Sequence, residues 1–322
     1  MNAQPNFVGP SQRGFSLVEL MVAITLGFIV VAAVGYLYLG SRQSFRNTES
    51  MARIQENARY ALDTMARDVR MVGSLGCTSL IEAAPTIGSP VPVALVPAPT
   101  NANAIVGGDT GSNPPGVPAA TVPRVAGDAL SIWGAQGSSA TLATITGGAN
   151  PYAYKANDIL AVVTCRPAAD APPTAMLRAA PVNLTTLPGA ATDEVMKFDR
   201  FSYYLGTNPA GVRALYRNSI NDGLAELVDG VEDMQIMYGV DTTAVPDRVA
   251  DVYQTAAAVA DWTRVVSVRI TLLMASLDNL AASAQTYRID TNDDGVLDAV
   301  IAADRRIYQT FSTTVGIRNR LQ

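Results

Sequence analysis

An acidic stretch near the end of the chain holds the residue types best suited to binding a metal ion. Oxygen-bearing side chains alternate along it, and Gly295 stands where the chain must turn. Calcium takes roughly six to eight oxygen ligands, and this spacing fits the first part of a calcium-binding loop. The ligands would be Asp290, Asn292, Asp294, Asp298 and the backbone carbonyl of Val296. Because Ile301 replaces the glutamate that usually closes such a loop, any Ca²⁺ site is expected to be incomplete or closed by another acid, such as Asp304. A solvated turn between strands is the alternative.

The two cysteines of the chain, Cys77 and Cys165, are candidates for a covalent cross-link. A single even pair in a domain exported to an oxidising compartment predicts a disulfide, and two buried free thiols are the alternative. Closing a loop of this length would stabilise the fold by about 4 kcal/mol in the chain-entropy model. Mass analysis of the unreduced protein distinguishes the two cases.

Acid–base and nucleophilic chemistry has few candidates in this composition. The chain has no histidine, which removes the commonest general base, the usual partners of nucleophiles and most zinc sites. Its lysines are Lys155 and Lys197, and neither lies in a phosphate-binding loop motif. No pair of carboxylates is singled out by spacing. We therefore expect a protein without an active site.

The distribution of charge argues against nucleic acid as a partner. Residues 71–322 carry sixteen basic and twenty-three acidic residues, whereas the preceding segment has an excess of arginine. Contacts to phosphates require clustered lysine and arginine. The acidic outer domain therefore predicts partners other than nucleic acid.

An apolar stretch near the N-terminus carries one charged residue in an unusual position. Residues 15–39 are uncharged except for Glu19, and as a helix these twenty-five residues span roughly 37 Å, more than the ~30 Å of a bilayer's hydrocarbon. A carboxylate in hydrocarbon costs on the order of 2.5–3.5 kcal/mol on insertion scales, so a retained one is expected to have a partner or a role. One local role is a capping box, in which Glu19 reaches back to the Ser16 amide.

The residues around this stretch predict its orientation. Arg13 immediately precedes it, which favours a cytoplasmic N-terminus and an outward C-terminal part. A conventional signal peptide is the alternative, because Val31-Ala32-Ala33 fits a cleavage site. Glu19 within the apolar run, and the lack of a break after Ala33, favour a membrane-spanning helix over residues 15–40.

The run Gly14-Phe15-Ser16-Leu17-Val18-Glu19-Leu20 resembles the processing site of type IV prepilins. The resemblance implies a leader peptide over residues 1–14, cleavage between Gly14 and Phe15 by a prepilin peptidase, and N-methylation of Phe15. It also implies that Glu19 attracts the N-terminal ammonium of a neighbouring subunit, an attraction that is strong at low dielectric. Type IV pilins and pseudopilins share this start, so it indicates the class and not the member.

The helical pattern continues over residues 41–72. Apolar residues recur there at three- and four-residue steps, which predicts an amphipathic second half of one long helix. They are Met51, Ile54, Ala58, Ala61, Leu62, Met65, Val69 and Val72. Gly73 and Gly76 are expected to end the helix.

Residues 73–322 are expected to form a β-rich extracytoplasmic domain. Nine prolines over 85–123 predict an irregular surface loop. From residue 128 onward, short β-type runs alternate with turn residues. The expected strands are 128–133, 141–146, 158–164, 195–205, 212–217, 224–229, 231–240, 264–275 and 307–317, with one helix at 250–260. The predicted fold is α+β and pilin-like, with the long N-terminal helix packed on an antiparallel, sheet-rich outer domain.

Three later blocks resemble the PilW family of type IV pilus minor pilins. They are Leu227-Val228-Asp229-Gly230-Val231-Glu232-Asp233-Met234-Gln235 with Tyr238-Gly239-Val240-Asp241, Trp262-Thr263-Arg264-Val265-Val266-Ser267-Val268-Arg269-Ile270, and Phe311-Ser312-Thr313-Thr314-Val315-Gly316-Ile317-Arg318-Asn319-Arg320. The resemblance implies a structural subunit that helps to prime filament assembly and sits at or near the pilus tip. Its partners would be other minor pilins and the major pilin, contacted through the N-terminal helix, and a tip adhesin. It would be a single-pass inner-membrane protein with a periplasmic domain before assembly, and part of the pilus at the cell surface afterwards.

Two other classes remain open from the sequence. One is a minor pseudopilin of a type II secretion system, which shares the N-terminal chemistry. The other is a membrane-anchored extracytoplasmic adhesin or enzyme that joins no filament. An N-methylated Phe15 would exclude this last class.

Overall fold

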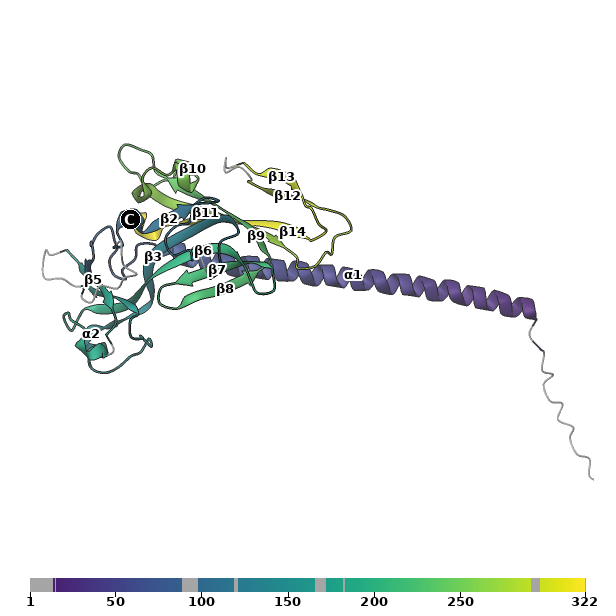
Figure 1. Ribbon diagram of the computed structural model, residues 1–322, viewed down its shortest axis with the longest axis horizontal. Helices are drawn as coiled ribbons and strands as arrows, with labels where there is room; N and C mark the ends of the chain where they lie inside the picture. Colours follow the sequence, from purple (N-terminus) through teal and green to yellow (C-terminus); the bar gives the residue numbers. More distant parts are fainter. Residues whose placement is uncertain are drawn as a thin grey trace, which may run out of the picture. The chain divides into compact units, whose positions relative to one another are not determined.

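The computed structural model of the protein describes residues 14, 16–88, 98–118, 121–165, 172–181, 183–290 and 296–321. Over these residues the chain has one long helix, α1 (Leu17–Arg70), and three β-sheets (Figure 1). It divides into an N-terminal unit, Met1–Ser50, and a C-terminal unit, Met51–Gln322. The fold is the predicted combination of a long N-terminal helix and an antiparallel, sheet-rich domain.

The helix α1 has the length that the sequence predicted. It contains 54 residues and ends before Gly73, which adopts a left-handed conformation with φ +71°. A residue without a Cβ adopts this conformation at little cost, which is why glycine commonly follows the last turn of a helix. The Gly73 N–H then donates to the Trp133 carbonyl at 2.8 Å, so the chain passes directly from the helix to a sheet.

The second half of α1 packs on the core of the C-terminal unit through one face. The buried residues of this face are Ile54, Ala58, Ala61, Met65, Ala66 and Val69. They follow the predicted apolar stripe except at its start, where Met51 is exposed. Because the stripe is continuous over four turns, burial of this face orients the helix about its own axis.

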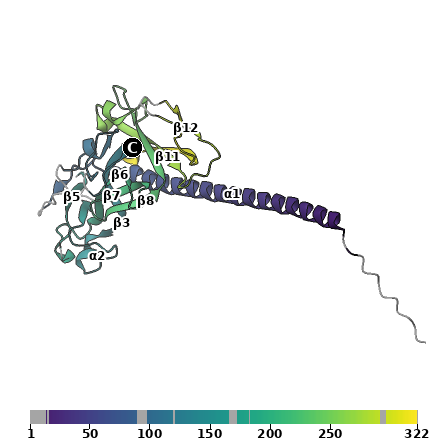
Figure 2. The ribbon, with the colours of Figure 1, turned by 45° about the vertical axis from the view of Figure 1, so that its right-hand side comes forward.

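The larger sheet contains eight strands in the described part of the chain. They are β1 (Thr86–Ile87), β2 (Ile105–Gly108), β3 (Ala126–Thr141), β4 (Ile159–Thr164), β5 (Thr174–Ala179), β6 (Glu194–Thr207), β7 (Arg213–Ser219) and β8 (Gly223–Asp229). Their order is β1-β5-β4-β6-β3-β2, and β7 pairs with β6 and β8. The pairs are antiparallel except β1 with β5. Figure 2 shows β6, β7 and β8 side by side.

The smaller sheet is antiparallel and has the order β10-β9-β11-β14. Its strands are β9 (Val231–Val240), β10 (Val252–Gln254), β11 (Val265–Ala275) and β14 (Tyr308–Gly316). Gly230 joins β8 to β9, and a Cβ there would meet the Ala275 carbonyl oxygen at 2.7 Å. A hairpin of β12 (Thr286–Ile289) and β13 (Asp298–Ile301) lies against β14, where Tyr287 stacks on Tyr308.

Alternation along the strands produces hydrophobic clusters on both faces of the larger sheet. In β4, Ile159, Ala161 and Val163 belong to the main core, which also holds the buried face of α1. The intervening Leu160 and Val162 pack on the opposite face with residues of the short helix α2 (Leu142–Thr146). Successive side chains of a strand point to opposite faces, so one strand serves both clusters.

The prediction of an irregular loop over residues 85–123 was wrong for β1 and β2. The strand β2 pairs in register with β3, from Ile105 opposite Ile132 to Gly108 opposite Ala129. The nearest prolines, Pro99 and Pro114, flank this strand and do not interrupt it. Proline at the ends of a strand is compatible with a sheet, and proline in its middle is not.

Two further expectations were wrong in secondary structure. Residues 141–146 form no strand, because the Thr141 hydroxyl accepts from the Thr144 N–H and starts α2. Residues 250–260 form β10 and a single 3₁₀ turn, not a helix. At that turn the Asp109 carboxylate accepts the N–H groups of Ala256 and Ala257 at 2.8 and 2.7 Å. Nothing in the local sequence predicts these two long-range hydrogen bonds.

Candidate assembly site

The first turns of α1 carry Glu19, the charged residue that the sequence singled out. Glu19 is exposed in the first turn of the helix, and the Leu20 N–H donates to the Ser16 carbonyl at 3.1 Å. Phe15 lies outside the described residues, so cleavage between Gly14 and Phe15, and the role of the new amino group, stay predictions. The capping box of Ser16 and Glu19 is likewise neither seen nor contradicted.

Apart from Glu19, the side chains of residues 17–40 form an apolar surface on every side of the helix. Between residues 17 and 40 the described residues are all exposed, with Phe28 at 71% and Tyr36 at 80%. The hydroxyl of Thr25 in this segment donates to the backbone carbonyls of Met21 and Val22, both at 2.9 Å. By length and composition this helix can cross a membrane. A helix that is apolar all round requires lipid or other apolar helices around it.

A polar clasp holds the end of α1 on the larger sheet of the C-terminal unit. The Asp68 carboxylate accepts the Tyr203 hydroxyl at 2.5 Å and the Arg217 guanidinium at 2.9 and 3.0 Å. Arg217 also lies over the Phe201 ring, 3.8 Å from its centre. Burial, with the nearby Asp68, raises the pKa of Tyr203 well above its usual value. The clasp links residues far apart in the chain, and the sequence analysis did not find it.

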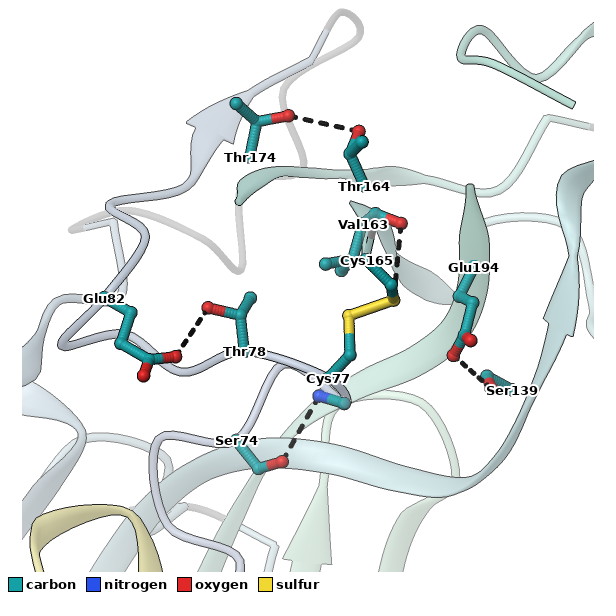
Figure 3. Close-up of a disulfide and its surroundings, with 11 residues drawn as sticks. Ser74, Cys77, Thr78, Glu82, Ser139, Val163, Thr164, Cys165, Thr174 and Glu194 are labelled. Atoms are coloured by element: carbon teal, nitrogen blue, oxygen red, sulfur yellow. Dashed lines mark hydrogen bonds between the residues drawn. A yellow bond between two sulfur atoms is a disulfide. The ribbon is translucent and has the colours of Figure 1, made fainter. Parts of the chain in front are cut away.

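The structure joins Cys77 and Cys165 in the disulfide that the sequence predicted (Figure 3). The two Cα atoms are 5.7 Å apart, within the usual range for a disulfide. Cys77 lies in the turn that follows α1, and Cys165 follows the last residue of β4. In the same turn the Ser74 hydroxyl accepts the Gly76 N–H, and the Thr78 hydroxyl donates to Glu82. The bond thus fastens this turn to the sheet.

The acidic loop is described only in part. Residues 291–295, including Asn292 and Asp294, lie outside the described residues. Asp290 is buried and directly follows β12, and Asp298 begins β13 opposite Ile289. The loop therefore connects the two strands of a hairpin. Within the described ranges, no three His, Cys, Asp or Glu side chains are placed to hold a metal ion.

The expected closing residue of that calcium site is engaged elsewhere. The Asp304 carboxylate accepts the Nε–H of Arg306 at 2.7 Å. Arg306 also donates to Glu232 at 2.5 Å. Asp304 would have to leave this ion pair to reach a metal ion, so the structure favours an incomplete loop over one closed by Asp304. Calcium binding itself stays a prediction.

One carboxylate within the larger sheet has a strongly raised pKa. Asp199 of β6 has no exposed surface, and burial raises its pKa to about 6, although hydrogen bonds oppose this shift. Its Oδ1 accepts the N–H groups of Arg200 and Ile220, and its Oδ2 accepts from the Ser219 hydroxyl and the Gln136 amide. Each oxygen has two donors, so the group is satisfied by hydrogen bonds but not by a cation. Asp199 therefore has a structural role at the place where the pairing of β6 with β7 begins.

Comparisons with known proteins address the class of this molecule. Residues 9–35 match the model of the prokaryotic N-terminal methylation motif. The chain is 36% identical over 64 residues to a pilin-like protein, PilA3, of Thermus thermophilus, a match that spans 20% of this chain and 27% of that relative's length. A solved type IV-like pilin from Thermus thermophilus is 12% identical and aligns with 83% of this chain and 98% of its own, with a TM-score of 0.37. The motif and the shared sequence identify a type IV pilin-like protein.

The C-terminal part of the chain matches a second family model. Residues 202–319 match the PilW model, which is described as type IV pilus-assembly protein W. The match contains the predicted blocks at 227–241 and 262–270 and almost all of 311–320. It also covers β7, β8 and all strands of the smaller sheet. The predicted resemblance to the PilW family is therefore confirmed over residues 202–319.

Proposed function

We propose that the protein is a minor pilin of a type IV pilus that helps to prime filament assembly and sits at or near the pilus tip. The observation that carries this proposal is the helix α1, whose first half is apolar on every side and bears the single charge of Glu19. The same chain carries a PilW domain. A helix of this kind is suited to move from lipid into a bundle of similar helices. The proposal assigns no catalytic activity to the chain.

In the proposed mechanism, processing prepares the helix for assembly. A prepilin peptidase removes residues 1–14 and leaves a methylated, cationic amine on Phe15. Glu19 of one subunit pairs with the amine of a neighbour, which selects the register between helices. Transfer from lipid to a helix bundle gives little hydrophobic gain, because acyl chains are as apolar as leucine. Charge pairing and close packing therefore supply the selectivity.

The proposed location changes with the stage of assembly. Before assembly, residues 15–40 span the inner membrane with the N-terminus in the cytoplasm and the C-terminal unit in the periplasm. After assembly, the protein is part of the pilus at the cell surface, in contact with other minor pilins and the major pilin. Arg13, on the N-terminal side of the apolar stretch, supports this orientation.

Mass spectrometry of sheared filaments tests the processing step. We expect a peptide that begins at N-methylated Phe15. A mature chain that begins at any other residue would refute the proposal. Absence of the protein both from filaments and from the complex that initiates them would also refute it.

The variant Glu19→Ala tests the assembly step separately. We expect normal cleavage and normal membrane insertion, but a large loss of assembled filaments, because the neighbour's amine loses its counter-ion. Glu56→Ala, which removes an exposed carboxylate from the same helix outside the apolar half, is the matched control. Equal filament numbers in both variants would contradict the role of Glu19.

A further inference from the structure

A polar pocket of about 640 Å³ lies in the C-terminal unit where α1 ends. Its walls come from the turn after α1, the loop between β9 and β10, the start of β11, and the 3₁₀ turn Arg318–Arg320. The charged lining residues are Arg248, Arg264, Arg318, Arg320, Glu82 and Asp241. Residues 71–322 contain sixteen basic and twenty-three acidic residues. The pocket, with four arginines and two acids, therefore has the opposite charge balance.

The most buried of these arginines donates hydrogen bonds only to neutral acceptors among the described residues, although the nearby charge of Asp261 acts on it. Arg320 is 6% exposed. Its guanidinium donates to the carbonyls of Trp262, Val265 and Asn101 at 2.5 to 2.9 Å. Within the described residues, every acceptor that it touches is neutral. Burial lowers the pKa of Arg320 to about 10, so the group stays charged at neutral pH and contributes a positive field to the pocket.

The loop between β9 and β10 holds a second arginine at the pocket rim. Arg248 has φ +65°, a conformation that costs an L-residue with a side chain roughly 1–2 kcal/mol. Asp241 holds it there, because its carboxylate accepts the Arg248 N–H at 2.8 Å. The same carboxylate accepts the hydroxyl and the N–H of Thr243 at 2.6 and 3.1 Å. Backbone strain of this kind is concentrated at binding sites.

The charge of Asp241 is offset by Arg264, whose guanidinium lies 3.9 Å from the Asp241 carboxylate and donates to the Thr243 carbonyl at 2.6 Å. Arg248 and Arg318 are both exposed, and neither side chain has a hydrogen bond or ion pair to any described residue. The rim thus presents two free guanidiniums above a buried positive charge.

We propose that this pocket binds an acidic peptide segment of another protein, with Arg248 and Arg318 receiving its carboxylates. A planar guanidinium matches a carboxylate through paired N–H donors. The volume admits a few residues of extended chain. Glu82 lines the same pocket and can accept a peptide N–H, whereas it repels the dense charge of phosphates. The pocket does not involve Glu19, so this binding is separate from filament insertion.

Fluorescence anisotropy with the full-length protein in detergent micelles tests the proposal. The probe is a labelled peptide of alternating glutamate and glycine, and a glutamine–glycine peptide of the same length is its uncharged match. We expect binding of the first and not of the second. The double variant Arg248→Gln and Arg318→Gln should weaken binding on the order of 10-fold, because two charge-assisted contacts at an exposed rim are lost.

The control is the double variant Arg288→Gln and Arg305→Gln, which removes the same charge from exposed positions outside the pocket. It should bind the acidic peptide as the unmodified protein does. Equal weakening by both double variants, or no binding of the acidic peptide by the unmodified protein, would overturn the proposal. A preference for a double-stranded DNA oligonucleotide over the acidic peptide would overturn it in favour of phosphate binding.

Discussion

Asp199 predicts a pH dependence of stability whose size follows from its burial. Its pKa of about 6 compares with an ordinary value of 3.8 in the unfolded chain. The carboxyl group is fully buried, so solvent screening does not reduce the effect. At ~1.36 kcal/mol per pKa unit, the shift of about two units corresponds to about 3 kcal/mol. The perturbation to make is Asp199→Asn, which removes the charge and retains one acceptor oxygen.

The sign follows from which state binds the proton. Below about pH 3 the carboxyl is protonated in both the folded and the unfolded protein, and its contribution to stability is fully present. As pH rises towards about 6, the unfolded chain releases this proton before the folded protein does, and the contribution is lost. The free energy of unfolding of Asp199→Asn, relative to the unmodified protein, should therefore rise by about 3 kcal/mol between pH 3 and pH 7.

Urea unfolding of the full-length protein in detergent micelles, followed by tryptophan fluorescence, measures this difference. Using the difference between two proteins cancels other titrations, such as that of Asp241, whose pKa is lowered by its hydrogen bonds to Thr243 and Arg248. Glu56→Gln, at an exposed position of α1, should show a constant difference across the same range. A constant difference for Asp199→Asn as well would refute the reasoning.

Three further predictions concern the clasp, the disulfide and the acidic loop. Asp68→Ala leaves Arg217 and Tyr203 without their acceptor and should lower the unfolding free energy by about 2–3 kcal/mol. The control is Asp63→Ala, which removes an exposed ion pair with Arg59 and should cost under ~0.5 kcal/mol. The double variant Cys77→Ser and Cys165→Ser should lower the unfolding free energy by roughly 4 kcal/mol; unchanged stability would show that the bond does not form in the native protein. Calorimetric titration with Ca²⁺ should release heat that is lost in Asp290→Asn with Asp298→Asn, and no heat together with an unchanged melting temperature would retire the calcium site.

The elements that the sequence predicted well are those with strong local patterns. The strand β9 was expected over residues 231–240, and the structure has the same bounds. The apolar stripe of α1 and its glycine stop were equally clear. In these segments the local preference and the tertiary contacts favour the same conformation.

The strand β3 shows where local patterns were insufficient. It was expected over residues 128–133, yet it continues to Thr141. Gly134 is required by packing, since a Cβ there would meet the Met71 carbonyl oxygen at 2.6 Å. The need for glycine at this position therefore comes from a contact with the chain after α1, which no local pattern shows.

The strand β5 and the polar sites depended on long-range contacts. Residues 174–179 contain alanine, leucine and arginine, which favour helix, but pairing with β4 makes them a strand. Asp68 meets residues 135 and 149 positions away along the chain. The pocket arginines come from segments that no spacing rule connects. Such sites become visible only once the topology is known.

The disulfide between Cys77 and Cys165 has a mechanical consequence for a protein that is pulled from its N-terminal end. Once tension along α1 overcomes the packing of its buried face and the Asp68 contacts, it reaches Cys77 and passes through the disulfide into β4. The 88 residue steps between the cysteines would otherwise add roughly 300 Å of slack at ~3.4 Å per residue. With the disulfide intact, the residues between the cysteines cannot be extended by the load. The domain therefore lengthens less and refolds from a less extended state when the load is released.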